Sequence, residues 1–168
     1  MDFHLLDTNV ISVLFDARRS NHVAVRDALE AIDPGDPQYI SVVVMGELRY
    51  GMQAAALAGQ DVVHIRQTLD QADRFPLAEV NRHTAEAYGE VKARMAHHWL
   101  DLGRRVPRWV EDWKDRASSK TLQIDENDLW LVAQAIERNY RLITSDDKLI
   151  KRFVPAIPEL RYEFLEPG

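Results

Sequence analysis

The fold is decided by one stretch near the N-terminus, Phe3-His4-Leu5-Leu6-Asp7-Thr8-Asn9-Val10. A short apolar run leads to one acid, Asp7. Thr8 and Asn9 follow it, and such residues commonly begin helices because their side-chain oxygens accept hydrogen bonds from free backbone N–H groups. The pattern predicts a buried strand that ends in a carboxylate and leads directly into a helix. Because ligands bind at the carboxyl ends of strands in open α/β sheets, we expect Asp7 to form part of a site.

Composition limits the classes of protein to which the chain can belong. The 168 residues are 46% hydrophobic and 29% charged, which is typical of one globular domain. The formal net charge of -6 does not indicate a surface that binds nucleic acid everywhere. Without cysteine the chain has no disulfide, thiolate metal site or thiol nucleophile. No apolar stretch suits a signal peptide or a membrane span, so we expect a cytoplasmic protein with no membrane partner.

Strand and helix patterns alternate along the chain. Apolar residues at helical spacing predict helices, and short apolar runs predict strands. After the first strand and its helix, the predicted helices cover 21–32, 43–57, 61–74, 82–102, 108–117, 125–138 and a short turn around 149–150, and the predicted strands cover 39–42, 75–80, 141–144 and 162–165. This alternation predicts a single α/β domain over residues 1–168, with a mainly parallel central sheet flanked by helices on both faces.

Four acids fall where such a fold would gather them. Asp7 and Asp146 each follow an apolar strand, and neighbouring parallel strands end at the same edge of a sheet. Glu47 and Asp128 each lie early in a predicted helix. Four converging carboxylates repel one another and raise some of their pKa values unless a cation lies between them. Mg²⁺ or Mn²⁺ takes such oxygen ligands and is usually completed by substrate phosphate, so the set predicts metal-dependent phosphoryl chemistry.

Each acid also has an ordinary structural interpretation. Asp7 fits a turn before a helix, and Glu47 fits a solvated helix position. Asp128 fits a capping box with Asp125, and Asp146 or its neighbour fits the cap of the short helix that follows. The joint placement of the four acids, rather than any one of them, therefore favours a site.

Four short motifs occur in a defined order. They are Leu5-Leu6-Asp7-Thr8-Asn9-Val10, then Ser41 with Glu47 and Gly51, then Asn127-Asp128-Leu129-Trp130-Leu131-Val132-Ala133-Gln134-Ala135, and finally Leu142-Ile143-Thr144-Ser145-Asp146. Together they resemble the motifs of PIN-domain nucleases, specifically the VapC-type toxins of type II toxin–antitoxin modules. The resemblance runs over residues 3–153, nearly the whole chain.

This resemblance implies a PIN-like three-layer α/β/α fold and a metal-dependent endoribonuclease with one or two Mg²⁺ or Mn²⁺ ions. A water activated by the metal would attack the scissile phosphorus and leave a 5′-phosphate and a 3′-hydroxyl. The catalytic and metal-binding acids would be Asp7, Glu47, Asp128 and Asp146. The supporting polar residues would be Asn9, Ser41 and Thr144, with the Thr144 hydroxyl near the metal. The implied partners are an RNA substrate, a cognate antitoxin protein and a second copy of the chain in a homodimer.

One segment departs from the compact family pattern. The basic segment, residues 92–123, is longer and carries eight Lys or Arg against four Asp or Glu. Its tryptophans are Trp99, Trp109 and Trp113. Basic residues neutralise phosphates and aromatic rings stack on unpaired bases, so a helical segment of this kind fits a groove for single-stranded RNA. The expected RNA contacts are Arg104, Arg105 and Arg108. The alternative is that the tryptophans are core or dimer contacts and the charges form a solvated face.

Two other functions remain compatible with these acids. A haloacid-dehalogenase-like phosphatase, which depends on Mg²⁺, also begins with an Asp at a strand end. It requires a second Asp two residues later, where this chain has Asn9. A non-catalytic nucleic-acid-binding protein of the PIN fold typically lacks one or more of the four acids, whereas this chain has all of them. The sequence therefore favours the endoribonuclease.

Overall fold

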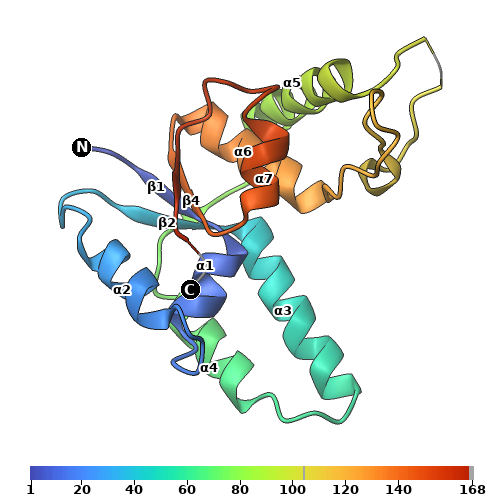
Figure 1. Ribbon diagram of the computed structural model, residues 1–168. Helices are drawn as coiled ribbons and strands as arrows, with labels where there is room; N and C mark the ends of the chain where they lie inside the picture. Colours follow the sequence, from blue (N-terminus) through green and yellow to red (C-terminus); the bar gives the residue numbers. More distant parts are fainter. Residues whose placement is uncertain (104, 167–168) are drawn as a thin grey trace.

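Five parallel strands form the centre of the molecule in residues 1–103 and 105–166, which the computed structural model describes (Figure 1). The sheet has the order β3-β2-β1-β4-β5. Its strands are β1 (His4–Leu6), β2 (Gln38–Ser41), β3 (Leu77–Ala78), β4 (Arg141–Thr144) and β5 (Tyr162–Phe164). The helices of this part of the chain are α1 (Thr8–Leu14), α2 (His22–Glu30), α3 (Val42–Leu57), α4 (Val63–Ala72), α5 (Arg82–Trp99), the short 3-10 helix η1 (Val110–Asp112), α6 (Glu126–Arg138) and α7 (Asp147–Phe153).

Strand β1 lies in the middle of the sheet and pairs in parallel with β2 on one side and β4 on the other. In the register of these pairs, Leu5 lies beside Tyr39 and Leu142. All three residues of β1 are buried. A strand covered on both faces by helices favours consecutive apolar residues over an alternating pattern, and Leu5 and Leu6 follow that rule while His4 is the buried polar exception. The predicted α/β class with a mainly parallel sheet is confirmed.

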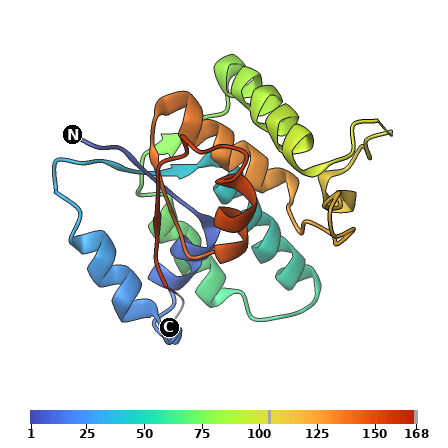
Figure 2. The same cartoon turned by 45° about the horizontal axis from the view of Figure 1, so that its top comes forward.

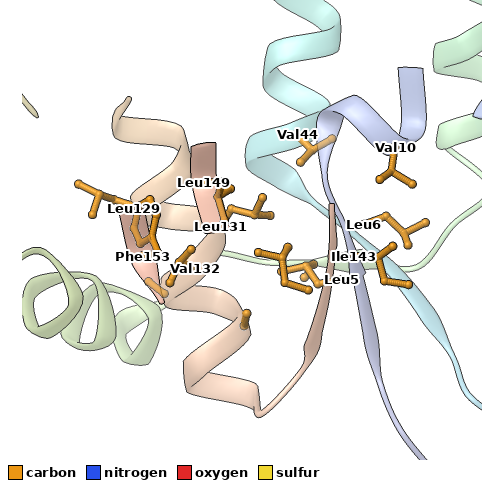
Figure 3. Packing of buried hydrophobic residues seen from close by; sticks show 14 of the residues in the cluster. Leu5, Leu6, Val10, Val44, Leu129, Leu131, Val132, Ile143, Leu149 and Phe153 are labelled. Carbon is orange, nitrogen blue, oxygen red and sulfur yellow. The ribbon is translucent and has the colours of Figure 1, made fainter. Parts of the chain in front are cut away.

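The helices divide into two layers. Helix α1 contacts α2, α3 and α4 on one face of the sheet, and α3 also contacts α4. Helices α5 and α6 pack together on the other face, where α6 also contacts β4 (Figure 2). The chain leaves β1 into α1 on one face, and it leaves the neighbouring β4 into α7, which lies beside α6 on the other face (Figure 3). In sheets of this kind, a crevice opens between two adjacent strands whose connections diverge.

The two layers meet the sheet through aliphatic and aromatic side chains. Figure 3 shows Leu129 and Val132 of α6 gathered with Leu149 and Phe153 of α7 on one side of the strands. Val10, at the start of α1, lies on the other side. All five side chains are no more than 2% exposed. Burial of each such side chain contributes roughly 1.5–3 kcal/mol, so this packing holds the strand ends in place.

Both ends of α6 are specified by local sequence. At its start, the Asp125 carboxylate accepts from the Asp128 backbone N–H at 2.9 Å, and the Asp128 carboxylate accepts from the Asp125 N–H at 3.2 Å. At its end, Asn139 adopts a left-handed conformation with φ of 53°, which Asn tolerates better than most residues. The chain then turns into β4. The predicted capping box is confirmed, and it places Asp128 in the first turn of α6.

The predicted helix over 108–117 is wrong, and residues 100–103 and 105–123 of the basic segment are not a regular helix. Among these described residues, only Val110–Asp112 forms a helical turn. The Asp115 carboxylate accepts from the N–H groups of Ala117 and Ser118, which makes a tight turn in place of helix. Backbone pairing of Lys114 with Thr121 then closes this turn.

Two other predicted boundaries also shift. The predicted strand 75–80 is reduced to Leu77–Ala78, because only these residues pair with β2. The predicted helix 82–102 ends at Trp99. No helix among the described residues combines the length and the apolar character needed to cross a bilayer.

Trp113 is expected to anchor the irregular segment, whereas Trp109 is not. The Trp113 side chain is 2% exposed, and its indole N–H donates to the Pro107 carbonyl at 3.0 Å. Replacement by Ala should therefore lower the free energy of unfolding by about 3–5 kcal/mol. Trp109 is 57% exposed, and Trp109→Ala should change it by about 0.5 kcal/mol or less. Urea unfolding of both variants measures the difference, and equal effects would contradict this packing.

Candidate active site

Asp7 lies at the point where the ends of β1 and β4 meet. Its side chain is only 6% exposed. One carboxylate oxygen accepts from the Thr144 hydroxyl at 2.6 Å, and the other accepts from the Thr8 backbone N–H at 2.6 Å. The Asp7 backbone N–H also donates to the Ile143 carbonyl at 3.0 Å. These hydrogen bonds join the two strand ends, and they make Asp7 the N-cap of α1 in place of the predicted Thr8 or Asn9.

Thr144 connects Asp7 to Asp146. The Thr144 side chain is fully buried, and its hydroxyl donates to Asp7 while it accepts from the Asp146 backbone N–H at 3.0 Å. The Asp146 carboxylate accepts from the N–H groups of Lys148 and Leu149 at 2.8 and 3.4 Å and so caps α7. The structural interpretation of Asp146 as a cap is confirmed. The same residue also lies half-buried beside Asp7, whose pKa its charge raises.

Glu47 reaches the same place from α3. Its carboxylate accepts a hydrogen bond from the Thr8 hydroxyl and another from the Asn127 side-chain amide, the latter at 2.9 Å. Glu47 thereby joins three helices, α1, α3 and α6. Neither Thr8 nor Asn127 was predicted to be a site residue, although each is adjacent in the sequence to a predicted acid.

The electrostatics show that the predicted acids lie within reach of one another. Burial raises the pKa of Asp7 to about 6, against the hydrogen bonds from Thr144 and Thr8, and the charges of Asp146 and Glu47 raise it further. Burial also raises the pKa of Asp128 to about 8. The charges of Asp125, Asp7 and Asp146 add to that shift. The structure therefore brings Asp7, Glu47, Asp128 and Asp146 to one edge of the sheet.

The supporting polar residues have different surroundings. Ser41 ends β2, is fully buried, and caps α3 by accepting from the Val43 N–H at 3.0 Å. It therefore positions the helix that carries Glu47. Asn9 is exposed and lines a cavity that Asp146 also lines. Thr144, described above, is the supporting residue that contacts a predicted acid directly.

Two of the predicted RNA contacts, Arg105 and Arg108, lie in the irregular part of the basic segment. The third, Arg104, is outside the described residues. Arg105 lines a surface cavity of about 570 Å³ formed within residues 100–119. The Arg108 guanidinium lies 4.8 Å from the centre of the exposed Trp109 ring. Trp99 is half-buried, and its indole N–H donates to the Arg152 carbonyl at 3.0 Å, so Trp109 is the tryptophan of this segment best placed to stack on a base.

The donor chemistry of the site fits a hard divalent cation. All four acids offer carboxylate oxygens, the ligands that Mg²⁺ and Mn²⁺ prefer. Within residues 1–103 and 105–166, no three His, Cys, Asp or Glu side chains are already gathered as the ligands of an ion. The fit therefore depends on ligand type, on the shared edge of the sheet and on the raised pKa values of Asp7 and Asp128, which burial causes first and the charges of neighbouring acids increase.

Comparison with known proteins identifies the fold family. The PIN domain family model matches residues 4–153. This chain belongs to the PIN-domain family. Its fold is similar to that of a chain of VapBC2 from Rickettsia felis, bound there to a DNA fragment from its promoter, with 20% sequence identity, a TM-score of 0.68 and coverage of 98% of this chain and 99% of that chain.

Two further solved structures show the same similarity. A chain of VapBC-1 from nontypeable Haemophilus influenzae has 21% identity and a TM-score of 0.65, with 97% of this chain and 98% of that chain covered. A chain of VapBC-5 from Mycobacterium tuberculosis has 24% identity and a TM-score of 0.58, with 99% of each covered. At these identities the similarity concerns the PIN fold. No curated protein matches the sequence.

The raised pKa of Asp128 makes the metal-free protein less stable as the pH rises. In the unfolded chain Asp128 ionises near pH 4, whereas in the folded protein it holds its proton until about pH 8. The stability penalty therefore grows between these values. Asp128→Asn, which keeps the shape without the charge, should be more stable than the unmodified protein, and by more at pH 8 than at pH 4.5.

Urea unfolding at both pH values, in buffer with a chelator, measures this difference. Asp70→Asn is the matched control, because Asp70 is exposed on α4. Histidine titration is common to all three proteins and cancels in the comparison. An advantage of Asp128→Asn that stays constant or shrinks as the pH rises would contradict the electrostatic description of the site.

The Thr144 hydroxyl is expected to be essential for stability at the junction of β1 and β4. Thr144→Val removes the donor to Asp7 and leaves the Asp146 N–H without its acceptor, which should cost about 1–3 kcal/mol. Thr144→Ser keeps both hydrogen bonds and should cost less than the Val variant. Urea unfolding at pH 7 compares them. A Ser variant as unstable as the Val variant would contradict the leading role of the hydroxyl, because loss of the methyl group alone would then cost as much as loss of both hydrogen bonds.

Proposed function

We propose that this protein is a metal-dependent endoribonuclease and the toxin of a toxin–antitoxin pair. The observation that carries the proposal is the coupling of four carboxylates at the crevice between β1 and β4. They come from the ends of two strands, the second turn of α3 and the first turn of α6. Without a bound cation these four acids lower the stability of the folded protein, because burial and mutual repulsion both oppose their ionisation. Membership of the PIN-domain family supports the nuclease assignment.

The four acids would hold one or two Mg²⁺ or Mn²⁺ ions. When bound, such an ion supplies positive charge to the phosphate oxygens and lowers the pKa of water. Thr144 fixes the Asp7 carboxylate, and Thr8 and Asn127 fix the Glu47 carboxylate. These donors limit the rotation of both side chains, and preorganised groups of this kind avoid reorganisation during the reaction. The substrate would be a phosphodiester of RNA.

The proposed substrate contacts extend onto the basic segment. Arg105 and Arg108 would neutralise RNA phosphates, and the exposed Trp109 ring would stack on an unpaired base. The Trp113 side chain is in the core and takes no part. Arg104, outside the described residues, stays a predicted contact.

The proposed partners follow from the similar structures. Those structures are of VapBC2, VapBC-1 and VapBC-5, and VapBC-5 is a member of the VapBC family of toxin-antitoxin systems. By analogy, this chain would form a homodimer and bind a cognate antitoxin. A partner that covers a crevice lined by four carboxylates would present basic side chains to it. An RNA substrate would place the protein in the cytoplasm.

A non-catalytic nucleic-acid-binding role is the second candidate. It is favoured by the hydrogen bonds from the chain itself that each of the four carboxylates already accepts. The phosphatase alternative is weaker, because Asn9 stands where a second catalytic Asp would be needed.

Asp7→Asn separates the nuclease from the non-catalytic binder. The variant keeps the shape of the side chain but removes a charge at the centre of the site, so cleavage of single-stranded RNA with Mn²⁺ should fall at least about 100-fold. RNA binding should persist. Sequencing of the RNA ends made by the unmodified and variant proteins measures both the activity and the cleavage position.

Asp70→Asn again serves as the control and should cleave like the unmodified protein. Addition of a chelator should abolish cleavage by every active form. Cleavage by Asp7→Asn at the unmodified rate would contradict the proposed nuclease, and RNA binding without cleavage by any form would favour the non-catalytic role.

A further inference from the structure

A polar cavity lies beside Asp146, on the side of the site formed by α1, the loop that follows it and the turn from β4 into α7. Its volume is about 460 Å³, within the range of small-ligand sites. The side chains of Asn9, Ser12 and Ser145 line it together with two cationic residues, Arg19 and Lys148. Neither Arg19 nor Lys148 belongs to the predicted catalytic set or to the basic segment.

Arg19 forms an ion pair with a neighbouring acid. Its Nε lies 3.6 Å from the Asp16 carboxylate, and Arg18 holds the same carboxylate through two hydrogen bonds of 2.7 and 3.0 Å. One acid therefore serves two guanidinium groups, and this small cluster keeps a net positive charge. Arg19 reaches the cavity, whereas Arg18 does not line it.

The backbone of Lys148 is positioned by a hydrogen bond to Asp146. Its backbone N–H donates to the Asp146 carboxylate at 2.8 Å, so the residue follows the capping turn that Asp146 forms. Lys148 lines the cavity, whereas Lys151, one turn further along α7, pairs with Asp147 at 2.5 Å and does not line it. The cavity thus combines a predicted metal-binding acid on one wall with two positive charges on the others.

We propose that this cavity binds the RNA phosphate next to the scissile bond, with Arg19 and Lys148 as its direct contacts and Asn9 and Ser145 as hydrogen-bonding groups around it. The inference rests on the proposed nuclease function. An RNA strand whose scissile phosphate lies at the four acids must continue past Asp146. The carboxylates of the site repel the phosphates of that strand. Cationic side chains next to the site are therefore needed to keep the scissile phosphate in position. Phosphate contacts of this kind position a strand without reading its sequence.

The test measures binding of a fluorescent single-stranded RNA to the Asp7→Asn protein over a range of salt concentrations. Adding Arg19→Ala or Lys148→Ala to it should weaken binding about tenfold, since a hydrogen bond between charged groups is lost. Each should also reduce the slope of log K against log salt by about 0.7. The matched controls are Arg26→Ala and Lys151→Ala, which remove the same charge from exposed residues that do not line the cavity and should stay within about twofold.

Cleavage kinetics give a second readout in the protein with Asp7 intact. Arg19→Ala and Lys148→Ala should raise KM about tenfold and leave kcat nearly unchanged, because they remove a positioning contact rather than a reacting group. If the cavity variants behave like their controls in both assays, the inference is overturned while the nuclease assignment stands. If no form cleaves RNA but the binding differences appear, the nuclease assignment fails and the cavity assignment stands.

Two further outcomes would also overturn the inference. One is the absence of RNA binding by the Asp7→Asn protein. The other is that inorganic phosphate, titrated in place of RNA, binds as tightly as RNA and is lost in the same variants. The cavity would then be a site for a free anion rather than for a strand. The inference predicts that phosphate alone competes weakly.

Discussion

The structure depends on the burial of one carboxylate, that of Asp7, between the ends of two parallel strands. Removing a carboxylate from water is costly unless hydrogen bonds compensate it. Here the Thr144 hydroxyl and the Thr8 N–H provide them, and the Thr144 hydroxyl in turn orients Asp146. The sheet order explains this location, because β1 and β4 are neighbours whose connections leave toward opposite faces. Helices α3 and α6 bring Glu47 and Asp128 to the crevice between these strands.

This arrangement brings four carboxyl groups together without an equal number of cationic side chains beside them in the described part of the chain. The pKa values of Asp7 and Asp128 both rise, first because of burial and then because each feels the charge of other acids. A sequence selected for stability alone would replace at least one of these acids by a neutral residue. Ionisable side chains with strongly shifted pKa values cluster at functional sites. Here a divalent cation would relieve the repulsion between the acids that destabilises the metal-free protein. In the proposed complex, the RNA strand would continue from the four acids into the polar cavity that Arg19 and Lys148 line.

The sequence was sufficient for the features that depend on local pattern. The apolar run before Asp7, the run 141–144 before Asp146 and the alternation of helices with strands predicted the sheet and two strand-end acids correctly. The Asp125–Asp128 capping box was also visible, because its residues are three apart. Hydrogen-bond partners that are distant in the chain could not be predicted from the sequence. The hydrogen bonds of Glu47 with Thr8 and Asn127 depend on how three helices pack. The predicted helix over 108–117 was wrong because turn hydrogen bonds, together with burial of Trp113, outweighed its helical spacing.

The most direct test of a shared cation site is calorimetric titration of the metal-free protein with Mn²⁺ at pH 7, in two buffers of different ionisation enthalpy. The account predicts that Mn²⁺ binds with release of protons, because carboxylates with raised pKa values must ionise to become ligands. It also predicts that neutralising any one of Asp7, Glu47, Asp128 or Asp146 as Asn or Gln weakens binding. Binding without proton release, or binding equally strong in all four variants, would contradict a single site built from these acids.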